Sequence, residues 1–250
     1  MKKKIVSVYG YGRFGKLWAE ILADDFHVKV FSRRGLKRDE VREDIEITTE
    51  EDLFNCDAMF FCVSISSFEE LLIQSKKYFK KDTVFFDTCS VKVYPVKWML
   101  KHITESAGII ATHPMFGPDS YRVSSEKLPM VMSNISANTD VFDYWEKYFS
   151  SKPIRIEIMT PDEHDEMVAY SQGITHYIGR VLADLNLKSG RINTLGYSKL
   201  LEIVQQTCND NWQLFLDLQE YNPYTPKMRE ELQKSLTKIS AIFDVHSKNI

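Results

Sequence analysis

Apolar and polar positions alternate along the first half of the chain in a pattern that predicts strands and helices in turn. The run at 58–63 (AMFFCV) is apolar throughout, which is typical of a parallel strand buried on both faces. Between the apolar runs at 5–8 and 27–31, hydrophobic side chains from Phe14 to Leu22 recur at helical spacing. Further strands are predicted at 45–48, 83–86, 108–111 and 154–159, and a further helix at 68–79. This alternation predicts an α/β fold with a doubly wound parallel sheet.

The pattern changes near residue 160, after which no strand is predicted. Helical spacing of apolar residues is found at 167–187, 197–221 and 227–245. Pro223 and Pro226 fall in the gap before the last of these helices. We therefore predict an α/β domain over residues 1–158 and an all-helical second domain over residues 159–250.

The composition indicates a globular protein and excludes several classes of partner. Apolar residues make up 44% of the 250 residues, charged residues make up 27%, and the formal net charge is −3. Nucleic-acid binding typically needs a strongly basic surface, so we expect no such partner. The apolar runs are too short for a membrane span or a signal peptide, which favours a cytoplasmic protein with no membrane partner. The four cysteines form no CxxC pair, and no metal site is expected.

A glycine-rich loop lies between the first predicted strand and the first predicted helix. The segment Gly10-Tyr11-Gly12-Arg13-Phe14-Gly15 has the GxGxxG pattern. Its first glycine allows a tight turn, its second lets the backbone approach a pyrophosphate, and its third lets the helix pack on the strand. The start of the helix adds free N–H groups for phosphate oxygens. The alternative is a tight turn without a ligand, but the strand-loop-helix context predicts a Rossmann-like domain that binds a dinucleotide. Val63 and Ser64, at the end of the strand at 58–63, are predicted to complete this cofactor site.

The end of the second strand bears on the choice of cofactor. NAD-binding domains place an acidic residue there for the ribose 2′-hydroxyl, whereas a 2′-phosphate favours arginine. This chain has Ser32, Arg33 and Arg34 at that point, within a basic cluster that spans residues 29–42. No acidic residue lies between the end of the strand and Asp39. We therefore predict NADP as the cofactor, with NAD as the alternative.

Two further segments follow predicted strands at the edge where open α/β sheets bind ligands. One is Ala111-Thr112-His113-Pro114-Met115-Phe116-Gly117-Pro118, and the other is Asp87-Thr88-Cys89-Ser90-Val91-Lys92. Pro114 restricts its own backbone and favours an extended His113. A histidine at the end of a strand in a cofactor domain is a candidate proton acceptor, because its ordinary pKa of about 6.5 leaves it neutral at pH 7.

These motifs carry a family resemblance. The sequence THPMFGP, about twenty residues after DxxSVK, resembles the prephenate/arogenate dehydrogenase family of tyrosine biosynthesis. The second half agrees through Ser171-Gln172-Gly173-Ile174-Thr175-His176, Gly179-Arg180-Val181-Leu182 and Asn193-Thr194-Leu195-Gly196-Tyr197, and it looks most like the arogenate dehydrogenases of plant type. The family's reaction is an oxidative decarboxylation of a cyclohexadienol. It converts arogenate to tyrosine, or prephenate to 4-hydroxyphenylpyruvate.

The resemblance implies roles for particular residues and an assembly. His113 would be the base, Ser90 would orient the substrate hydroxyl or the nicotinamide, and His176 would act from the second domain. Gln172, Thr175 and Arg180 would bind the substrate, since residues spaced by three and four share a helix face. His164 lies near a helix start and is interpreted as a residue of the cap region. The helical domain resembles the family's dimerisation domain, so a homodimer is expected.

The chain departs from the family at one point. Many bacterial members bind the side-chain carboxylate with an arginine from the helix that corresponds to 197–221, but here no arginine lies between Arg191 and Arg229. Arg180, Lys199 or Gln205 are the candidates for that contact. The missing arginine favours arogenate, whose ammonium group a guanidinium would repel.

Two other functions remain open from the sequence. A β-hydroxyacid or imine reductase has the same layout but would use a lysine or an acid on the long helix, and residues 164–182 contain no lysine. A redox sensor that binds NADP(H) without turnover would need only the glycine loop.

Overall fold

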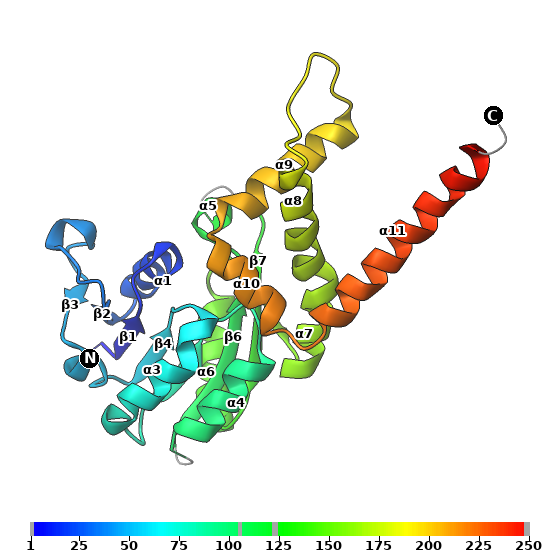
Figure 1. Cartoon of the computed structure of the whole chain (residues 1–250). Helices are drawn as coiled ribbons and strands as arrows, with labels where there is room; N and C mark the ends of the chain where they lie inside the picture. Colours follow the sequence, from blue (N-terminus) through cyan, green and yellow to red (C-terminus); the bar gives the residue numbers. More distant parts are fainter. Residues whose placement is uncertain (1–2, 105–106, 122–124, 248–250) are drawn as a thin grey trace. The chain divides into compact units, whose positions relative to one another are not determined.

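The computed structural model describes residues 3–104, 107–121 and 125–247 (Figure 1). The chain consists of two compact units, Met1–His164 and Asp165–Ile250. The division lies inside the helix α7 (Pro161–Val168), whereas the sequence pattern placed it between residues 158 and 159. The reason is that α7 begins three residues after the last strand ends at Ile158, before the chain leaves the first unit.

An eight-stranded sheet lies at the centre of the first unit, in the order β3-β2-β1-β4-β5-β6-β7-β8. The strands are β1 (Ile5–Tyr9), β2 (His27–Phe31), β3 (Glu46–Ile47), β4 (Ala58–Phe61), β5 (Val84–Asp87), β6 (Gly108–Pro114), β7 (Leu128–Asn134) and β8 (Ile154–Ile158). Strands β1 to β6 are parallel, which confirms the doubly wound arrangement. The strand order reverses between β1 and β4, and open α/β sheets bind ligands beyond the carboxyl ends of the strands at such a point.

Strand β7 is missing from the sequence-based prediction, and it makes the sheet mostly rather than wholly parallel. It runs antiparallel to β6 and parallel to β8. Pro129 is its second residue, and a proline argues against a central strand because it cannot donate to the ladder. Here the proline is tolerated near the strand start, where its carbonyl oxygen accepts a hydrogen bond from the Met115 N–H at 3.0 Å.

Helices cover both faces of this sheet. The helices of the first unit besides α7 are α1 (Arg13–Ala23), α2 (Glu50–Leu53), α3 (Phe68–Ser75), α4 (Val93–His102), α5 (Pro118–Tyr121) and α6 (Thr139–Ser150). Phe60 of β4 stacks on Phe86 at a centroid distance of 4.3 Å and also contacts Trp18 of α1. Its neighbour Phe61 points to the opposite face and packs against Phe68 of α3. This is why the strand at 58–63 reads as apolar throughout.

The second unit consists of helices joined by loops, with no strand in the part of it that the structure describes. A π-helix at Ala169–Gly173 separates α7 from α8 (Ile174–Asp184), and α9 (Leu195–Asn209), α10 (Trp212–Glu220) and α11 (Thr225–Ser247) follow. Helices α8 and α9 lie side by side (Figure 1). Their contact requires a glycine, because a Cβ atom on Gly179 would lie 2.1 Å from Oγ1 of Thr207.

The single helix predicted at 197–221 is two helices in the structure, so that prediction is wrong. Helix α9 ends at Asn209, and the Asn211 side chain caps α10 by accepting a hydrogen bond from the Leu214 N–H at 2.7 Å. Apolar residues keep their helical spacing across the break, so hydrophobic periodicity alone does not reveal where α10 begins.

Candidate active site

The glycine loop has the geometry that a dinucleotide needs. Gly10 has a φ of +98°, and a Cβ atom there would lie 2.2 Å from the Cys62 carbonyl oxygen. A Cβ atom on Gly15 would lie 2.1 Å from the Gly10 carbonyl oxygen, whereas one on Gly12 would meet nothing within 4 Å. The first and third glycines are therefore required by packing, and the second leaves its backbone open to a ligand.

The start of α1 is equally suited to phosphate. Gly12 is its N-cap, no side chain caps the helix, and its first turn contains no acidic residue. The free N–H groups and the positive end of the helix are thus available to an anion. The residues present fit a dinucleotide cofactor at this place.

The side chains of the loop are used within the protein rather than offered to a ligand. Tyr11 is buried in the hydrophobic core, and Phe14 stacks on Trp18 at a centroid distance of 5.6 Å. Arg13 forms an exposed ion pair with Asp119 at 2.7 Å. The loop would therefore hold a cofactor mainly through its main chain.

The basic cluster at residues 29–42 contains two kinds of arginine, those engaged in contacts within the protein and those exposed to solvent. Arg38 donates to the Ile45 carbonyl oxygen at 2.7 Å, and Arg42 pairs with Asp24 at 3.0 Å and with Asp44. Arg33 and Arg34 are exposed, and within the described part of the chain neither guanidinium has a recorded hydrogen bond or ion pair. These two arginines are the free cations at the end of β2, next to the buried Ser32.

The end of β4 lies against the glycine loop. The Cys62 N–H donates to the Tyr9 carbonyl oxygen at 2.8 Å, and Cγ1 of Val63 lies 3.1 Å from the position that a Cβ of Gly10 would take. The Ser64 hydroxyl is hydrogen-bonded to Ser67 at 2.7 Å. Val63 is thus placed beside the predicted cofactor site, while the Ser64 hydroxyl is already engaged nearby.

The histidine of the THPMFGP segment is buried and paired. His113 lies near the end of β6, where 3% of its surface is exposed, and its Nδ1 is 2.8 Å from Nε2 of His164 on α7. Burial lowers the pKa of His113 well below its ordinary value, and His164 and Lys92 act in the same direction. Burial and Lys92 lower the pKa of His164 to about 3. Both imidazoles are therefore neutral at pH 7.

The interpretation of His164 as a residue of the cap region is wrong. The helix is capped by Thr160, whose Oγ1 accepts from the Glu163 N–H at 3.3 Å while Glu163 accepts from the Thr160 N–H at 2.8 Å. This is a capping box, and the T-x-x-E spacing in the sequence would have located it. His164 follows in the first helical turn and is turned towards His113.

Ser90 lies on the loop that follows β5, beside the end of β6. It is 7% exposed, and its buried Oγ has no hydrogen-bond partner among the residues described. A buried hydroxyl left without a partner is costly, so this atom is suited to a substrate or cofactor group.

The second unit has a set of buried polar atoms of its own on one helical segment. Oε1 of Gln172, Nδ1 of His176 and Nε of Arg180 are buried and, in the described residues, unpartnered. They follow one another at four-residue intervals, as expected for one face. Thr175 differs, because its hydroxyl donates to the Ser171 carbonyl oxygen at 2.8 Å.

Arg180 is more constrained than the sequence suggests. Its Nη2 donates to the main-chain oxygens of Thr207 at 3.1 Å and Asp210 at 2.8 Å, and its guanidinium lies 5.0 Å from the ring centroid of Trp212. Burial and Arg180 lower the pKa of His176, and the carboxylate of Asp210 opposes them. Asp210 is thus a charged neighbour of this face that sequence reasoning missed.

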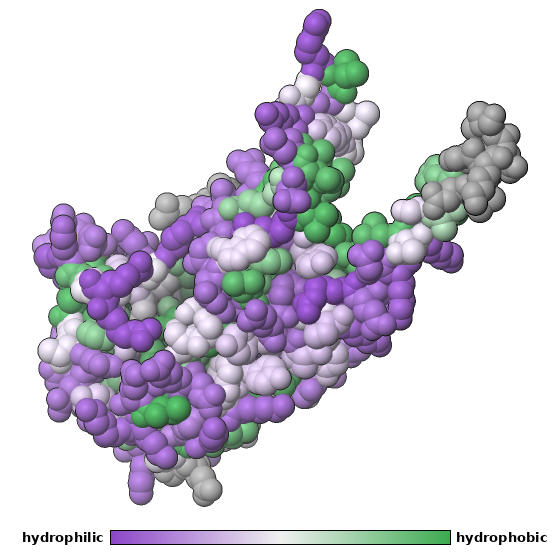
Figure 2. All heavy atoms as spheres, in the orientation of Figure 1, coloured by the Kyte–Doolittle hydropathy of each residue, from purple (hydrophilic) through white to green (hydrophobic). Residues whose placement is uncertain are grey.

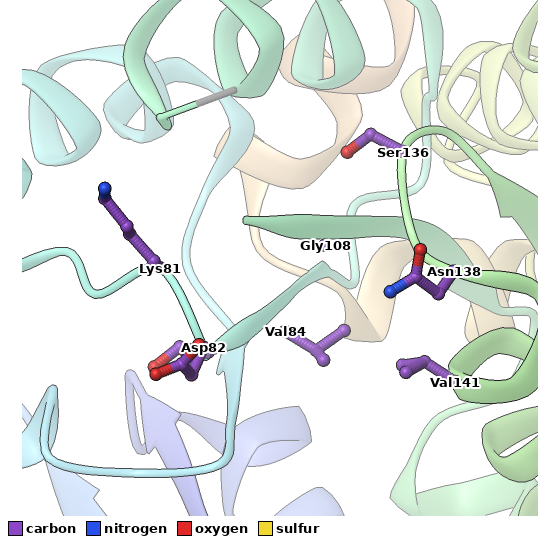
Figure 3. A pocket seen from close by; sticks show the side chains of 8 residues that line it. Lys81, Asp82, Val84, Gly108, Ser136, Asn138 and Val141 are labelled. Carbon is purple, nitrogen blue, oxygen red and sulfur yellow. The ribbon is translucent and has the colours of Figure 1, made fainter. Parts of the chain in front are cut away.

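A cavity of about 470 Å³ lies elsewhere, around the start of β5 and β6. Figure 3 shows Lys81, Asp82, Val84, Gly108 and Asn138 around it. These strand starts lie opposite the strand ends that carry Ser90 and His113, so the cavity does not belong to the candidate active site.

Comparisons with known proteins agree with this geometry. Residues 24–132 match the family described as prephenate dehydrogenase, nucleotide-binding domain, and residues 181–248 match the one described as TYRAAT1-like, C-terminal domain. Arogenate dehydrogenase 2, chloroplastic, of Arabidopsis thaliana is 29% identical over 94% of this chain, which spans 68% of that protein. Arogenate dehydrogenase 1, chloroplastic, of the same plant is 31% identical over 87% of this chain, which spans 36% of that protein.

The chain is similar to the prephenate/arogenate dehydrogenase family, whose nucleotide-binding domain matches residues 24–132. Members of this family are oxidoreductases.

Solved structures confirm the fold of the chain. Prephenate dehydrogenase from Aquifex aeolicus, in complex with hydroxyphenyl propionate and NAD+, has a TM-score of 0.76 and 14% identity, with 99% of this chain and 93% of that chain covered. Synechocystis arogenate dehydrogenase has a TM-score of 0.68 and 17% identity, with 97% and 93% covered. In the residues described, no helix is long and apolar enough to cross a membrane.

Proposed function

We propose that this protein catalyses the NADP-dependent oxidative decarboxylation of arogenate, with prephenate as the alternative substrate. The observation that carries the proposal is the neutral His113–His164 pair beside the glycine-loop edge of the sheet. A neutral imidazole next to a nicotinamide site is the base that oxidation of a ring hydroxyl requires.

His113 has one ring nitrogen for this task. Its Nδ1 is engaged with Nε2 of His164, so when Nδ1–H donates, the lone pair of Nε2 is free to accept the proton of the substrate hydroxyl. The nicotinamide cofactor supplies the hydride acceptor, and loss of CO2 makes the ring aromatic. Ser90 offers its unpartnered hydroxyl for orienting the reacting group.

The second unit would supply the contacts to the rest of the substrate. Nε of Arg180, and Nδ1 of His176 when it carries a proton, can donate to carboxylate or carbonyl oxygens, whereas Oε1 of Gln172 can accept from an N–H or O–H group of the substrate. Thr175 has its hydroxyl bound to its own helix and would contribute by contact. The carboxylate of Asp210, which acts on His176, would attract the ammonium group of arogenate and repel the anionic side chain of prephenate. This charge favours arogenate.

The cofactor proposal rests on the free arginines after β2. Arg33 and Arg34 can approach a 2′-phosphate with planar forks, and Ser32 adds a hydroxyl. The main chain at Gly12 and the open start of α1 would receive the pyrophosphate, while Gly10 and Gly15 allow the close packing that places them there.

The alternatives have weaker support. An imine reductase from a Pseudomonas species shares the fold with a TM-score of 0.55. Such an enzyme would use a lysine or an acid on the long helix, and residues 164–182 contain Asp165 and Glu166 but no lysine. A cofactor-binding sensor would require the glycine loop and leave the buried histidine pair without a role.

The surface of the second unit supports a homodimer. Leu236, Ile239 and Ile242 are 54%, 56% and 47% exposed and recur at three-residue intervals along α11. Figure 2 shows hydrophobic surface on this unit. Such apolar stripes are typical of interfaces, and a second copy of the chain would cover them. A cytoplasmic location stays a prediction.

Turnover is tested by reduced-nicotinamide absorbance with arogenate or prephenate and NADP or NAD. We expect the highest kcat/KM for arogenate with NADP. Asp210→Asn should lower kcat/KM for arogenate about tenfold while sparing prephenate, because one charge contact is lost. If none of the four combinations of substrate and cofactor produced reduced nicotinamide, although the protein was shown separately to bind NADP, the dehydrogenase proposal would be overturned. Equal losses for both substrates would remove Asp210 from substrate choice.

The base is tested by His113→Asn. We expect kcat to fall by about 100-fold or more, with the Kd for NADP near the wild-type value, because asparagine cannot accept the proton. His102→Asn is the matched control, since His102 is a largely buried histidine at the end of α4, hydrogen-bonded to Glu69 at 3.0 Å and outside the candidate site. Wild-type turnover in His113→Asn would show that another group is the base.

The 2′-phosphate contact is tested by Arg33→Ala combined with Arg34→Ala. We expect the KM for NADP to rise about tenfold or more and the KM for NAD to change little, because only NADP has the second anionic group. Arg155→Ala combined with Lys147→Ala removes two positive charges at exposed positions of β8 and α6 and controls for the change in net charge. A parallel rise for both cofactors would contradict the assignment.

The assembly is tested by light scattering. For the wild-type protein we expect a mass of twice the chain mass of 29.2 kDa, as for a dimer. Leu236→Asp combined with Ile239→Asp should give the mass of a single chain, because two charges would lie in the apolar interface. Ala241→Asp, at an exposed position on the opposite face of the same helix, is the control. A monomeric wild-type protein would refute the homodimer.

A further inference from the structure

A buried ion pair joins the ends of β5 and β6 directly beside the histidine pair. Lys92 and Asp87 both have fully buried side chains, and Nζ of Lys92 donates to Oδ2 of Asp87 and, at 2.6 Å, to the Thr112 carbonyl oxygen. The Asp87 carboxylate also accepts from the N–H groups of Cys89 at 3.1 Å and Thr112 at 3.2 Å. The ammonium is therefore held in one place by acceptors from two strands.

Such a pair is not explained by stability alone. Removing two charges from water is costly, and well-packed apolar residues often give equal or greater stability at the same place. A charge retained at this cost, next to a candidate base, points to an electrostatic task.

The position of Lys92 defines that task. The carbonyl group that it binds belongs to Thr112, so it holds the peptide link that leads into His113. The groups that act on the His113 ring are His164 from α7 and Lys92 from the loop after β5, and Lys92 also acts on His164. Asp87 contacts Lys92 and anchors it from β5.

We propose that Lys92, anchored by Asp87, is a positioning residue that fixes the backbone at His113 and keeps the His113–His164 pair uncharged through its own positive charge; this inference rests on the proposed role of His113 as the base. The fixed cation disfavours a second positive charge on either imidazole. The base is thus ready to accept a proton over a wide pH range.

The test compares pH profiles of kcat/KM for wild type and for Asp87→Asn combined with Lys92→Met, which removes both charges together. Wild type should stay active to the lowest pH at which it remains folded. The double variant should lose activity as the pH falls below about 6, an acid limb displaced upward by about one pH unit or more, because the imidazolium is no longer repelled. A double variant that folds and keeps the wild-type profile would overturn the proposal.

Two further variants make the result specific to charge. Lys92→Gln retains a donor for the Thr112 carbonyl oxygen but leaves the Asp87 carboxylate, so its acid limb should move further upward than that of the double variant. Lys101→Met is the matched control, because Lys101 is exposed on α4 and pairs with Glu69 at 3.0 Å. An unmoved acid limb in a folded Lys92→Gln protein would also overturn the proposal.

A second readout is independent of turnover. The His113 ring is followed by NMR titration, with its resonance assigned by comparison with His113→Asn. In wild type the ring should stay neutral well below pH 6.5, and in the Lys92 variants it should protonate at higher pH. An ordinary titration near pH 6.5 in wild type would overturn the proposal even if no variant folds. Shifted titration without any turnover would instead show that the proposed dehydrogenase function fails while the role of Lys92 holds.

Discussion

Close contact between main-chain atoms at the switch point of the sheet determines the geometry of the first unit. Gly10, which follows β1, meets the Cys62 carbonyl after β4, and Gly15 of α1 meets the Gly10 carbonyl in turn. A side chain at either glycine would separate strand from helix. Because α1 can approach this closely, its open N-terminus lies at the edge where β4, β5 and β6 also end. The cofactor loop, Ser90 and His113 are consequences of that one arrangement.

At this edge the protein combines a strong buried charge with two uncharged rings. Lys92 and Asp87 satisfy each other and the surrounding main chain, whereas His113 and His164 share one hydrogen bond. Desolvation disfavours the imidazolium, and a neighbouring ammonium disfavours it further. The result is an imidazole pair that stays neutral without exposure to solvent. A carboxylate partner, as in many catalytic histidine pairs, would favour the charged form instead.

The helical unit uses its polar residues in a different way. Arg180 is committed through Nη2 to the main chain near the end of α9, while one atom on each of Gln172, His176 and Arg180 remains without a partner. The π-helix before α8 adds a residue to the turn that carries Gln172. Such turns occur frequently at functional sites, because they reorient side chains at a small cost in helix geometry.

The sequence alone determined the elements whose signals are local. Strand β2 lies at the predicted residues 27–31, and the glycine loop, the end of β6 with His113 and the free cations at Arg33 and Arg34 follow from spacing and motif. Only the tertiary structure revealed β7, since its partners β6 and β8 outweigh the unfavourable Pro129. It also decided the break between α9 and α10, the pairing of His164 with His113 across 51 residues of sequence, and the burial of Lys92. Hydrophobic periodicity in a sequence indicates which face of a helix or strand is apolar. It does not indicate which polar groups from distant segments will meet, because such contacts form only when the folded sheet brings those segments together.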